Sequence, residues 1–280
     1  MSTIELTQLD YSALTQQISL ALPTAALAWE PAWHEPHPED DILSPLRWND
    51  QPYQGINMLR LWAAATQEQY PYPHWMTHQR AVCLGGELKD QAQGVRISYV
   101  QTRSATMGGD YAEGLAFYRS YTVYNVADLA GLPARYYELP KKVGGSNPDA
   151  RHDTLEAFFV ATKVEIVRGN EAMYLAESDQ VVLPAFEWFE SAAAYYATAA
   201  HELIHWSRHP RRLNQRVGDA EEEVIAELGA CFLLATVGLA PSARQLSYLR
   251  HWLAASETPL ESLAGAAVES VSYLQTFECR

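Results

Sequence analysis

Cysteine and long apolar runs are scarce in this sequence. Its 280 residues include three Cys, Cys83, Cys231 and Cys279, which are too few and too scattered for a disulfide scaffold. No uncharged apolar run approaches the roughly eighteen residues of a membrane helix, and Met1–Glu5 lacks the basic segment that opens a signal peptide. The sequence therefore predicts a protein of a reducing cytoplasm that has no membrane partner.

Basic residues are also few. The chain has 20 Lys and Arg against 34 Asp and Glu, which gives a formal charge of −14. Residues 1–140 hold eight Lys and Arg against fifteen Asp and Glu, so this half alone carries −7. Bulk electrostatic attraction to a polyanion is therefore excluded as the main source of affinity for a partner.

The chain does have enough apolar material for a large core. Apolar residues make up 48% of it, with eight Trp and sixteen Tyr, which suffices for one or two domains. The stretch 139–149 is rich in Gly, Pro and turn-forming residues and has no apolar periodicity. We therefore expect a linker over 141–152, between an N-terminal domain of residues 1–140 and a C-terminal domain of residues 153–280.

The expected secondary structure indicates an α+β fold. In the first domain, residues 4–22 and 56–66 have helical patterns, whereas 94–102 and 116–126 combine apolar, β-branched and aromatic residues as strands do. The second domain is expected to be mainly helical, with a small sheet. Its sheet would use short extended segments near 164–166, 172–175 and 180–183, after a helix over 154–162 and with a hairpin-like turn at Gly169-Asn170.

The most informative motif is H-E-x-x-H, from His201 to His205. It lies inside the apolar run Tyr195–Trp206, which is expected to be a largely buried helix. Residues four apart share one face of a helix, so His201 and His205 can direct both imidazoles at one metal ion. Glu202 stands beside them and is the expected catalytic base, which deprotonates water activated by the metal. Two His and a Glu on a buried helix need partners, which favours a metal site over a solvent-facing helix.

The third ligand is expected from a second helix, over residues 220–234. Glu223 and Glu227 lie one turn apart beside its apolar stripe, where a carboxylate is costly unless it is paired or bound to metal. We expect Glu223 to bind the metal and Glu227 to accept a hydrogen bond from a ligand imidazole, with the reverse assignment still open. A place at the positive end of the helix dipole explains Glu221 and is one explanation of Glu222.

These residues resemble the ArdC-like antirestriction proteins of plasmids and mobile elements. The resemblance in the C-terminal half runs through the H-E-x-x-H helix and the helix that carries Glu223. In the N-terminal half it includes Leu84-Gly85-Gly86, and the run from Tyr121 to Val126 that leads to Gly131-Leu132-Pro133. The resemblance implies an N-terminal domain that binds single-stranded DNA and a C-terminal zincin-like metallopeptidase domain. It also implies that the protein protects DNA from restriction as the DNA enters a new bacterial cell.

Single-strand binding by so acidic a half would have to combine aromatic stacking with a local groove of cations. Trp29 and Trp33, in a Pro-rich loop, are the aromatic residues least easily explained as core. Arg47, Arg60 and Arg80 are the main candidates for the groove, which Arg96 and Arg103 could extend. The other stacking candidates, each more readily explained as core, are Trp48, Tyr53, Trp62, Tyr70, Tyr72 and Trp75.

Two hypotheses from different classes follow. In the first, the protein is a hydrolase that binds Zn²⁺, with Mn²⁺ as an alternative, and cleaves a peptide bond in a host restriction component. Tyr248 is then a candidate to stabilise the oxyanion, although a core position explains it as well. In the second, the protein coats DNA or occludes a DNA-binding partner with its acidic surface, and the metal is structural. Glu202 favours the first hypothesis, because a structural metal site needs no base.

Overall fold

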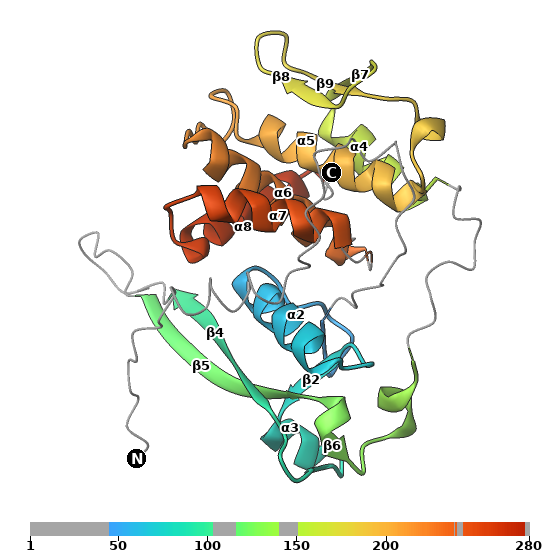
Figure 1. The fold of residues 1–280 in the computed structure, drawn as a ribbon, viewed down its shortest axis with the longest axis vertical. Coiled ribbons are helices and arrows are strands. Elements are labelled where there is room, and N and C mark those ends of the chain that lie inside the picture. The colour runs from blue at the N-terminus through green and yellow to red at the C-terminus, as the bar shows by residue number, and fades with distance from the viewer. Residues whose placement is uncertain (1–44, 103–115, 140–150, 238, 240–242, 278–280) are drawn as a thin grey trace, which may run out of the picture.

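The computed structural model describes residues 45–102, 116–139, 151–237, 239 and 243–277. The helix expected over 4–22, the residues Trp29 and Trp33, and most of the expected linker lie outside these ranges. The described residues form an α+β fold, as predicted, with a mixed sheet in the N-terminal half and a helical layer with a small sheet in the C-terminal half (Figure 1). No described helix is long and apolar enough to cross a membrane.

The N-terminal sheet is built on a long antiparallel ribbon. Strand β4 (Gly94–Thr102) pairs along its whole length with β5 (Ala116–Asn125), and the strand order is β1-β2-β5-β4. Helix α2 (Ile56–Glu68) packs against β4. These elements confirm the expected helix and the two expected strands. The short elements β1 (Leu46–Arg47), β2 (His74–Thr77) and α3 (His78–Cys83) were not expected as such, because each has too few residues for a periodic pattern.

Two glycine-containing segments that are far apart in the sequence lie against one another. Strand β3 (Glu87–Leu88) pairs with β6 (Leu129–Ala130), which brings Gly85 close to Gly131. Gly131 has φ +77°, and a Cβ there would lie 2.8 Å from the Gly85 carbonyl oxygen. Only glycine fits this conformation and this approach without strain. Two 3₁₀ helices, Val126–Asp128 and Ala134–Tyr137, complete this corner around a small apolar cluster.

The C-terminal half begins with α4 (Asp153–Thr162) and a sheet of β7 (Glu165–Arg168), β8 (Met173–Leu175) and β9 (Gln180–Leu183). The expected hairpin at Gly169-Asn170 is wrong, because β9 lies between the other two strands. The backbone N–H of Gly169 donates to Leu183 O and so continues the parallel β7–β9 ladder. The reversal that does form a hairpin joins β8 to β9.

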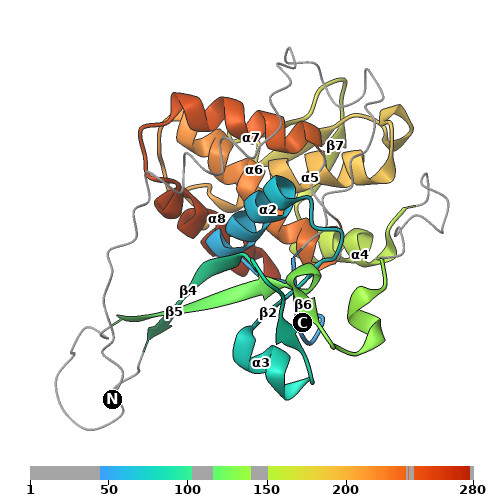
Figure 2. The same cartoon turned by 60° about the horizontal axis from the view of Figure 1, so that its bottom comes forward.

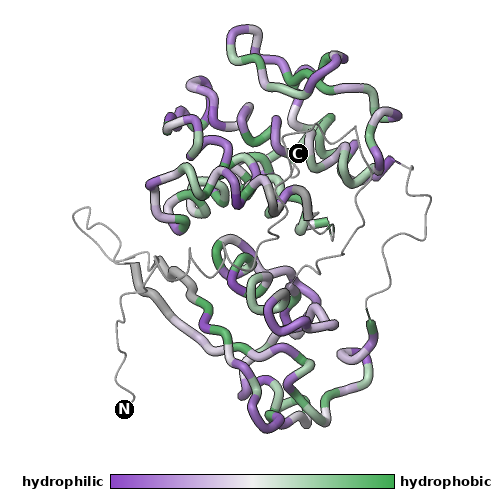
Figure 3. The backbone as a smooth tube through the Cα atoms, viewed as in Figure 1, coloured by the Kyte–Doolittle hydropathy of each residue, from purple (hydrophilic) through white to green (hydrophobic). Residues whose placement is uncertain are grey.

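Apart from a 3₁₀ helix at Phe186–Trp188, the helices described in the rest of this half are α5 (Ala192–Ser207), α6 (Asp219–Thr236), α7 (Ala243–Ala255) and α8 (Leu260–Gln275). Helix α6 packs against the other three, and its stretch 224–235 is buried throughout and mostly apolar (Figure 3). Helix α2 lies against α8, so the two halves share one continuous core (Figure 2).

The approach of α5 to α6 positions the candidate site. A Cβ on Gly229 would lie 2.7 Å from the side chain of Ile204, so this glycine lets the two helices come close. On α5 this contact lies between His201 and His205, and on α6 it lies two residues beyond Glu227 and six beyond Glu223. A larger residue at Gly229 would force the two sets of side chains apart.

Candidate metal centre

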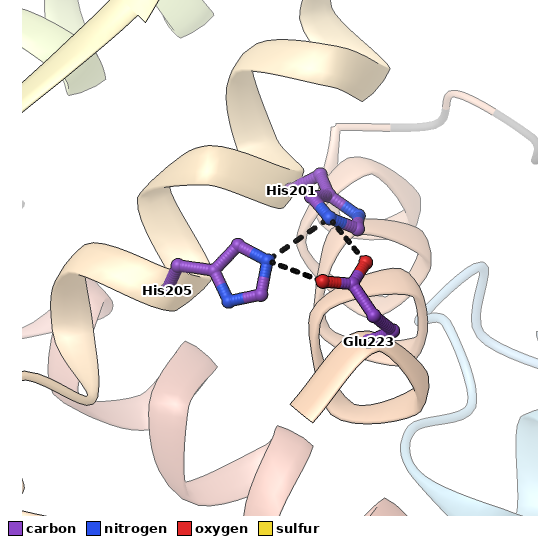
Figure 4. Close-up of side chains that lie close together, drawn as sticks. All are labelled: His201, His205 and Glu223. Carbon is purple, nitrogen blue, oxygen red and sulfur yellow. Dashed lines mark hydrogen bonds and ion pairs between the residues drawn. The ribbon is translucent and has the colours of Figure 1, made fainter. Parts of the chain in front are cut away.

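Helix α5 presents two imidazoles on one face. The helix begins after Ser191, whose side chain caps it by accepting a hydrogen bond from the Ala194 N–H. His201 and His205 follow one turn apart, with their Nε2 atoms 3.1 Å apart (Figure 4). Both face α6, as the four-residue spacing predicts.

Glu223 of α6 lies between these two Nε2 atoms. Its Oε2 is 3.3 Å from His201 Nε2, and its Oε1 is 3.6 Å from His205 Nε2 (Figure 4). One donor atom from each of the three residues falls within 4.8 Å of the others. Among the described residues no other group of His, Cys, Asp and Glu has this arrangement.

The opposite edge of each ring faces another carboxylate. His201 Nδ1 lies 3.3 Å from Glu227 Oε1, and His205 Nδ1 lies 3.3 Å from Glu222 Oε1. The His201 contact is close but is not aligned as a hydrogen bond, so its buried Nδ1 has none. Glu227 therefore lies beside the imidazole of His201, and its role as acceptor for a ligand imidazole stays a prediction. Glu222, which the helix dipole seemed to explain, is a contact that sequence reasoning missed.

The charges around these residues fit a bound cation. Burial opposes protonation of His201, but the carboxylates of Glu227 and Glu223 outweigh it and raise the pKa of His201 well above its usual value. The pKa of Glu223 is lowered, because the two imidazoles outweigh the effect of its burial. The site thus attracts positive charge. Two imidazoles and one carboxylate are the donor set of a catalytic divalent metal site with an open position.

Glu202 lies beside the three donors and is 7% exposed. Burial raises its pKa, while the nearby His201 and His205 and a hydrogen bond from the backbone N–H of Tyr174 act in the opposite direction. Tyr174 belongs to β8, so the small sheet contributes directly to the environment of this carboxylate. A raised pKa makes a carboxylate a better proton acceptor.

The site opens into a cavity of about 880 Å³. Its walls are β8, the face of α5 that carries His201 and His205, the loop after α5, the first turns of α6, and one face of α7, which contributes Tyr248 and Trp252. Tyr248 therefore lies on the wall of the cavity, as its expected role as oxyanion stabiliser requires. A space of this size accommodates a segment of peptide.

Comparison with known proteins accounts for both halves of the chain. Residues 153–269 match a family described as a zincin-like metallopeptidase, and residues 9–124 match the N-terminal domain of anti-restriction factor ArdC. The crystal structure of the antirestriction protein ArdC from plasmid R388, metal-free, is 30% identical, covers 95% of this chain and 97% of that one, and has a TM-score of 0.69. The chain belongs to the ArdC-like antirestriction family.

Other relatives extend the ArdC-like comparison. The Mn(II)-bound crystal structure of the same R388 protein has a TM-score of 0.69 and 30% identity, with 96% and 98% of the two chains covered. An uncharacterized protein, y4eC, of Sinorhizobium fredii (strain NBRC 101917 / NGR234) is 30% identical over 92% of this chain and 87% of its own length. DNA primase TraC of Escherichia coli is 27% identical over 92% of this chain, which corresponds to 26% of the primase.

In this ArdC-like chain, Arg212 connects the small sheet of β7, β8 and β9 to the end of α5, the helix that carries His201 and His205. Its guanidinium lies 3.9 Å from the centre of the Trp206 ring, and its Nε donates to the Trp206 carbonyl oxygen. Its other nitrogens donate to both carboxylate oxygens of Asp179 and to the Tyr174 hydroxyl. The β8–β9 hairpin, which supports Glu202, is thereby fixed to the end of α5.

This cluster predicts a loss of stability in acid. Hydrogen bonds from Arg212, opposed by partial burial, lower the pKa of Asp179 to about 2. Because this folded-state pKa lies below the unfolded value of about 4, the ionised carboxylate stabilises the fold above pH 4, and the contribution disappears as the pH falls towards 2. We expect Asp179→Asn to lower the thermal unfolding temperature at pH 6 and to have much less effect at pH 2.5. An equal effect at both pH values would contradict this account.

The candidate DNA-binding residues differ in how exposed their side chains are. Trp29 and Trp33 lie outside the described residues. Arg60 is a correction: it is 7% exposed, and its Nη1 donates to Arg96 O, because its position on α2 faces the sheet. Arg47 is half-buried with its guanidinium 5.4 Å from the centre of the Tyr53 ring. Only Arg80 of the three expected cations is exposed.

Arg80 lies over an exposed tryptophan. Its guanidinium is 4.1 Å from the centre of the Trp48 ring, and Trp48 is 36% exposed. Arg135, which sequence reasoning missed, donates to the Trp48 carbonyl oxygen at 3.2 Å and is half exposed. No local pattern connects Arg135 with Trp48, because they are 87 residues apart and meet only in the fold.

Proposed function

We propose that this ArdC-like protein protects incoming plasmid or mobile-element DNA from host restriction, and that its C-terminal domain acts as a metal-dependent peptidase. The observation that carries the proposal is Glu202, a buried carboxylate beside the His201, His205 and Glu223 donors at the base of an open cavity. We assign the peptidase to residues 153–280 and the DNA-associated function to residues 1–140, joined by a linker over 141–152.

Three roles in peptide hydrolysis would fall to residues that line the cavity. His201, His205 and Glu223 would hold a divalent ion, Zn²⁺ or Mn²⁺, which when bound polarises a peptide carbonyl and makes water more acidic. Glu202 accepts a proton from that water and returns it to the leaving amine as the peptide bond breaks. Tyr248 of α7, which lines the same cavity, would donate a hydrogen bond to the developing oxyanion.

Strand β8 favours an extended polypeptide as the substrate. Among the described strands it pairs with β9 alone, and its residues Met173 and Tyr174 line the cavity together with Ala172, which precedes the strand. An edge strand beside a cavity can bind a peptide through main-chain hydrogen bonds. A component of the host restriction system is the substrate that agrees with antirestriction.

The proposal is tested by plasmid transfer. A plasmid that carries restriction sites is moved into a restricting recipient that produces either the wild-type protein or Glu202→Gln, and the restriction subunits are followed by mass spectrometry. The peptidase hypothesis requires protection, and loss of an intact restriction subunit, with the wild-type protein alone.

We further propose that the N-terminal domain binds single-stranded DNA through Trp48, Arg80 and Arg135. The observation in favour is that two of the eight basic residues of this acidic half contact one exposed tryptophan: Arg80 lies over the Trp48 ring, and Arg135 donates to its carbonyl oxygen. An exposed aromatic ring with cations beside it can bind a single strand by base stacking together with local phosphate contacts.

Trp48→Ala is therefore expected to weaken binding of an oligothymidylate by about 5–100-fold, the equivalent of one lost base-stacking contact. Fluorescence anisotropy with a labelled oligonucleotide measures the affinity. The matched control is Trp188→Ala, which removes a more exposed tryptophan from the C-terminal half, 51% exposed against 36%. Equal affinity in the two variants would reject the Trp48 assignment.

A further inference from the structure

His205 contacts the carboxylate of Glu222, which is not one of the three metal donors. Its Nε2 faces His201 Nε2 at 3.1 Å, and its Nδ1 lies 3.3 Å from Glu222 Oε1. An imidazole that binds metal through Nε2 carries its proton on Nδ1, so the group that accepts this proton fixes the tautomer and the rotation of the ring. Glu222 is that group for His205.

Glu222 is itself held by a buried arginine. Nε of Arg208 donates to both carboxylate oxygens of Glu222 at 2.9 Å, and Nη1 donates to Gln215 Oε1 at 2.6 Å. The Arg208 side chain is 2% exposed, so water cannot replace these bonds. A buried guanidinium requires a carboxylate as its counter-charge, and this requirement fixes the Glu222 carboxylate beside His205.

The neighbouring acidic residues of α6 make the assignment specific. Glu223 faces the Nε2 edges of both imidazoles, whereas Glu222 faces the Nδ1 edge of His205. Glu221 turns away and accepts hydrogen bonds from the hydroxyls of Ser256 and Thr258. Three successive glutamates therefore have three different sets of partners, and Glu221 offers a control for the other two.

We propose that Glu222, held by Arg208, is a positioning residue of the metal centre. It keeps His205 Nε2 directed at the metal, and Arg208 prevents the Glu222 carboxylate from binding the metal in place of Glu223. This inference rests on the metal site of the proposed function, but it does not depend on the substrate or on whether a peptide is cleaved.

The test measures metal affinity and the protonation of His205. The decisive variant is Glu222→Leu combined with Arg208→Met, which removes the acceptor together with its counter-charge and leaves no unpaired buried charge. Chelator competition is expected to show Zn²⁺ binding weakened by about 10–100-fold. In the Zn²⁺-loaded protein, the downfield Nδ1–H proton signal of His205 in NMR spectra should shift upfield or disappear. Glu222→Gln, which keeps an acceptor oxygen, should lose less affinity than the double variant.

Glu221→Gln is the matched control and should leave both measurements unchanged. The inference is overturned if the double variant binds Zn²⁺ as tightly as this control and retains the His205 signal. A wild-type protein that binds neither Zn²⁺ nor Mn²⁺ would overturn the proposed function as well. The two failures are therefore distinguishable by the wild-type titration alone.

Discussion

Glu202→Gln is expected to slow peptide hydrolysis by about 10²–10⁴-fold, the usual contribution of a general base. Protection of incoming DNA should then fall to the level of a cell that lacks the protein. Gln preserves the shape of Glu but cannot accept a proton, and Glu202 is not among the three metal donors, so metal content should be unchanged. The measurement is the ratio of plasmid transfer into restricting and non-restricting recipients, with metal analysis of the same variant.

Glu190→Gln provides the control for this experiment. Glu190 lines the same cavity but lies before α5 begins, so the same chemical change there should leave protection intact. Full protection by Glu202→Gln with normal metal content would exclude hydrolysis as the mechanism. The second hypothesis would then be favoured. In that hypothesis the protein shields DNA or occludes a DNA-binding partner, and the metal is structural.

The part of this site that the sequence predicts is the part that depends on local periodicity. His201 and His205 come together because a helix repeats every 3.6 residues, whatever packs around it. Glu223 and Glu227 could be assigned from their place beside an apolar stripe, and the structure puts each next to a different edge of an imidazole. The longer helices and the two long strands were predictable from local sequence patterns as well.

The features that sequence reasoning missed depend on contacts between distant segments. The order β7-β9-β8 follows from a parallel pairing that no turn sequence encodes. Arg208 donates to Glu222 because α5 and α6 pack closely, and the close packing at Gly229 is a contact between distant segments. Arg60 had a usable signal, since Met58, Leu59, Leu61 and Trp62 surround it on α2, and such an apolar neighbourhood predicts a buried side chain.

Glu223→Ala is expected to leave the protein with almost no bound metal, because the variant retains only two of the three donors. Glu227→Ala should still bind about one equivalent, with affinity reduced by about 10–100-fold, as expected when the partner of a ligand imidazole is lost. Elemental analysis after dialysis, on proteins whose circular dichroism spectra are unchanged, distinguishes the two variants. Glu221→Ala should retain the metal, since Glu221 contacts Ser256 and Thr258 instead.

The geometry favours Glu223 over Glu227 as the metal ligand. Glu223 reaches the Nε2 atoms of both His201 and His205, whereas Glu227 reaches only the Nδ1 edge of His201, on the other side of the ring. A metal bound by Glu227 would need His201 to bind through Nδ1, and its Nε2 would then turn away from His205. Loss of metal in Glu227→Ala together with retention in Glu223→Ala would therefore require the ring of His201 to be reoriented. If Glu227 were the ligand, it could no longer be the hydrogen-bond acceptor that the proposed site assigns to His201.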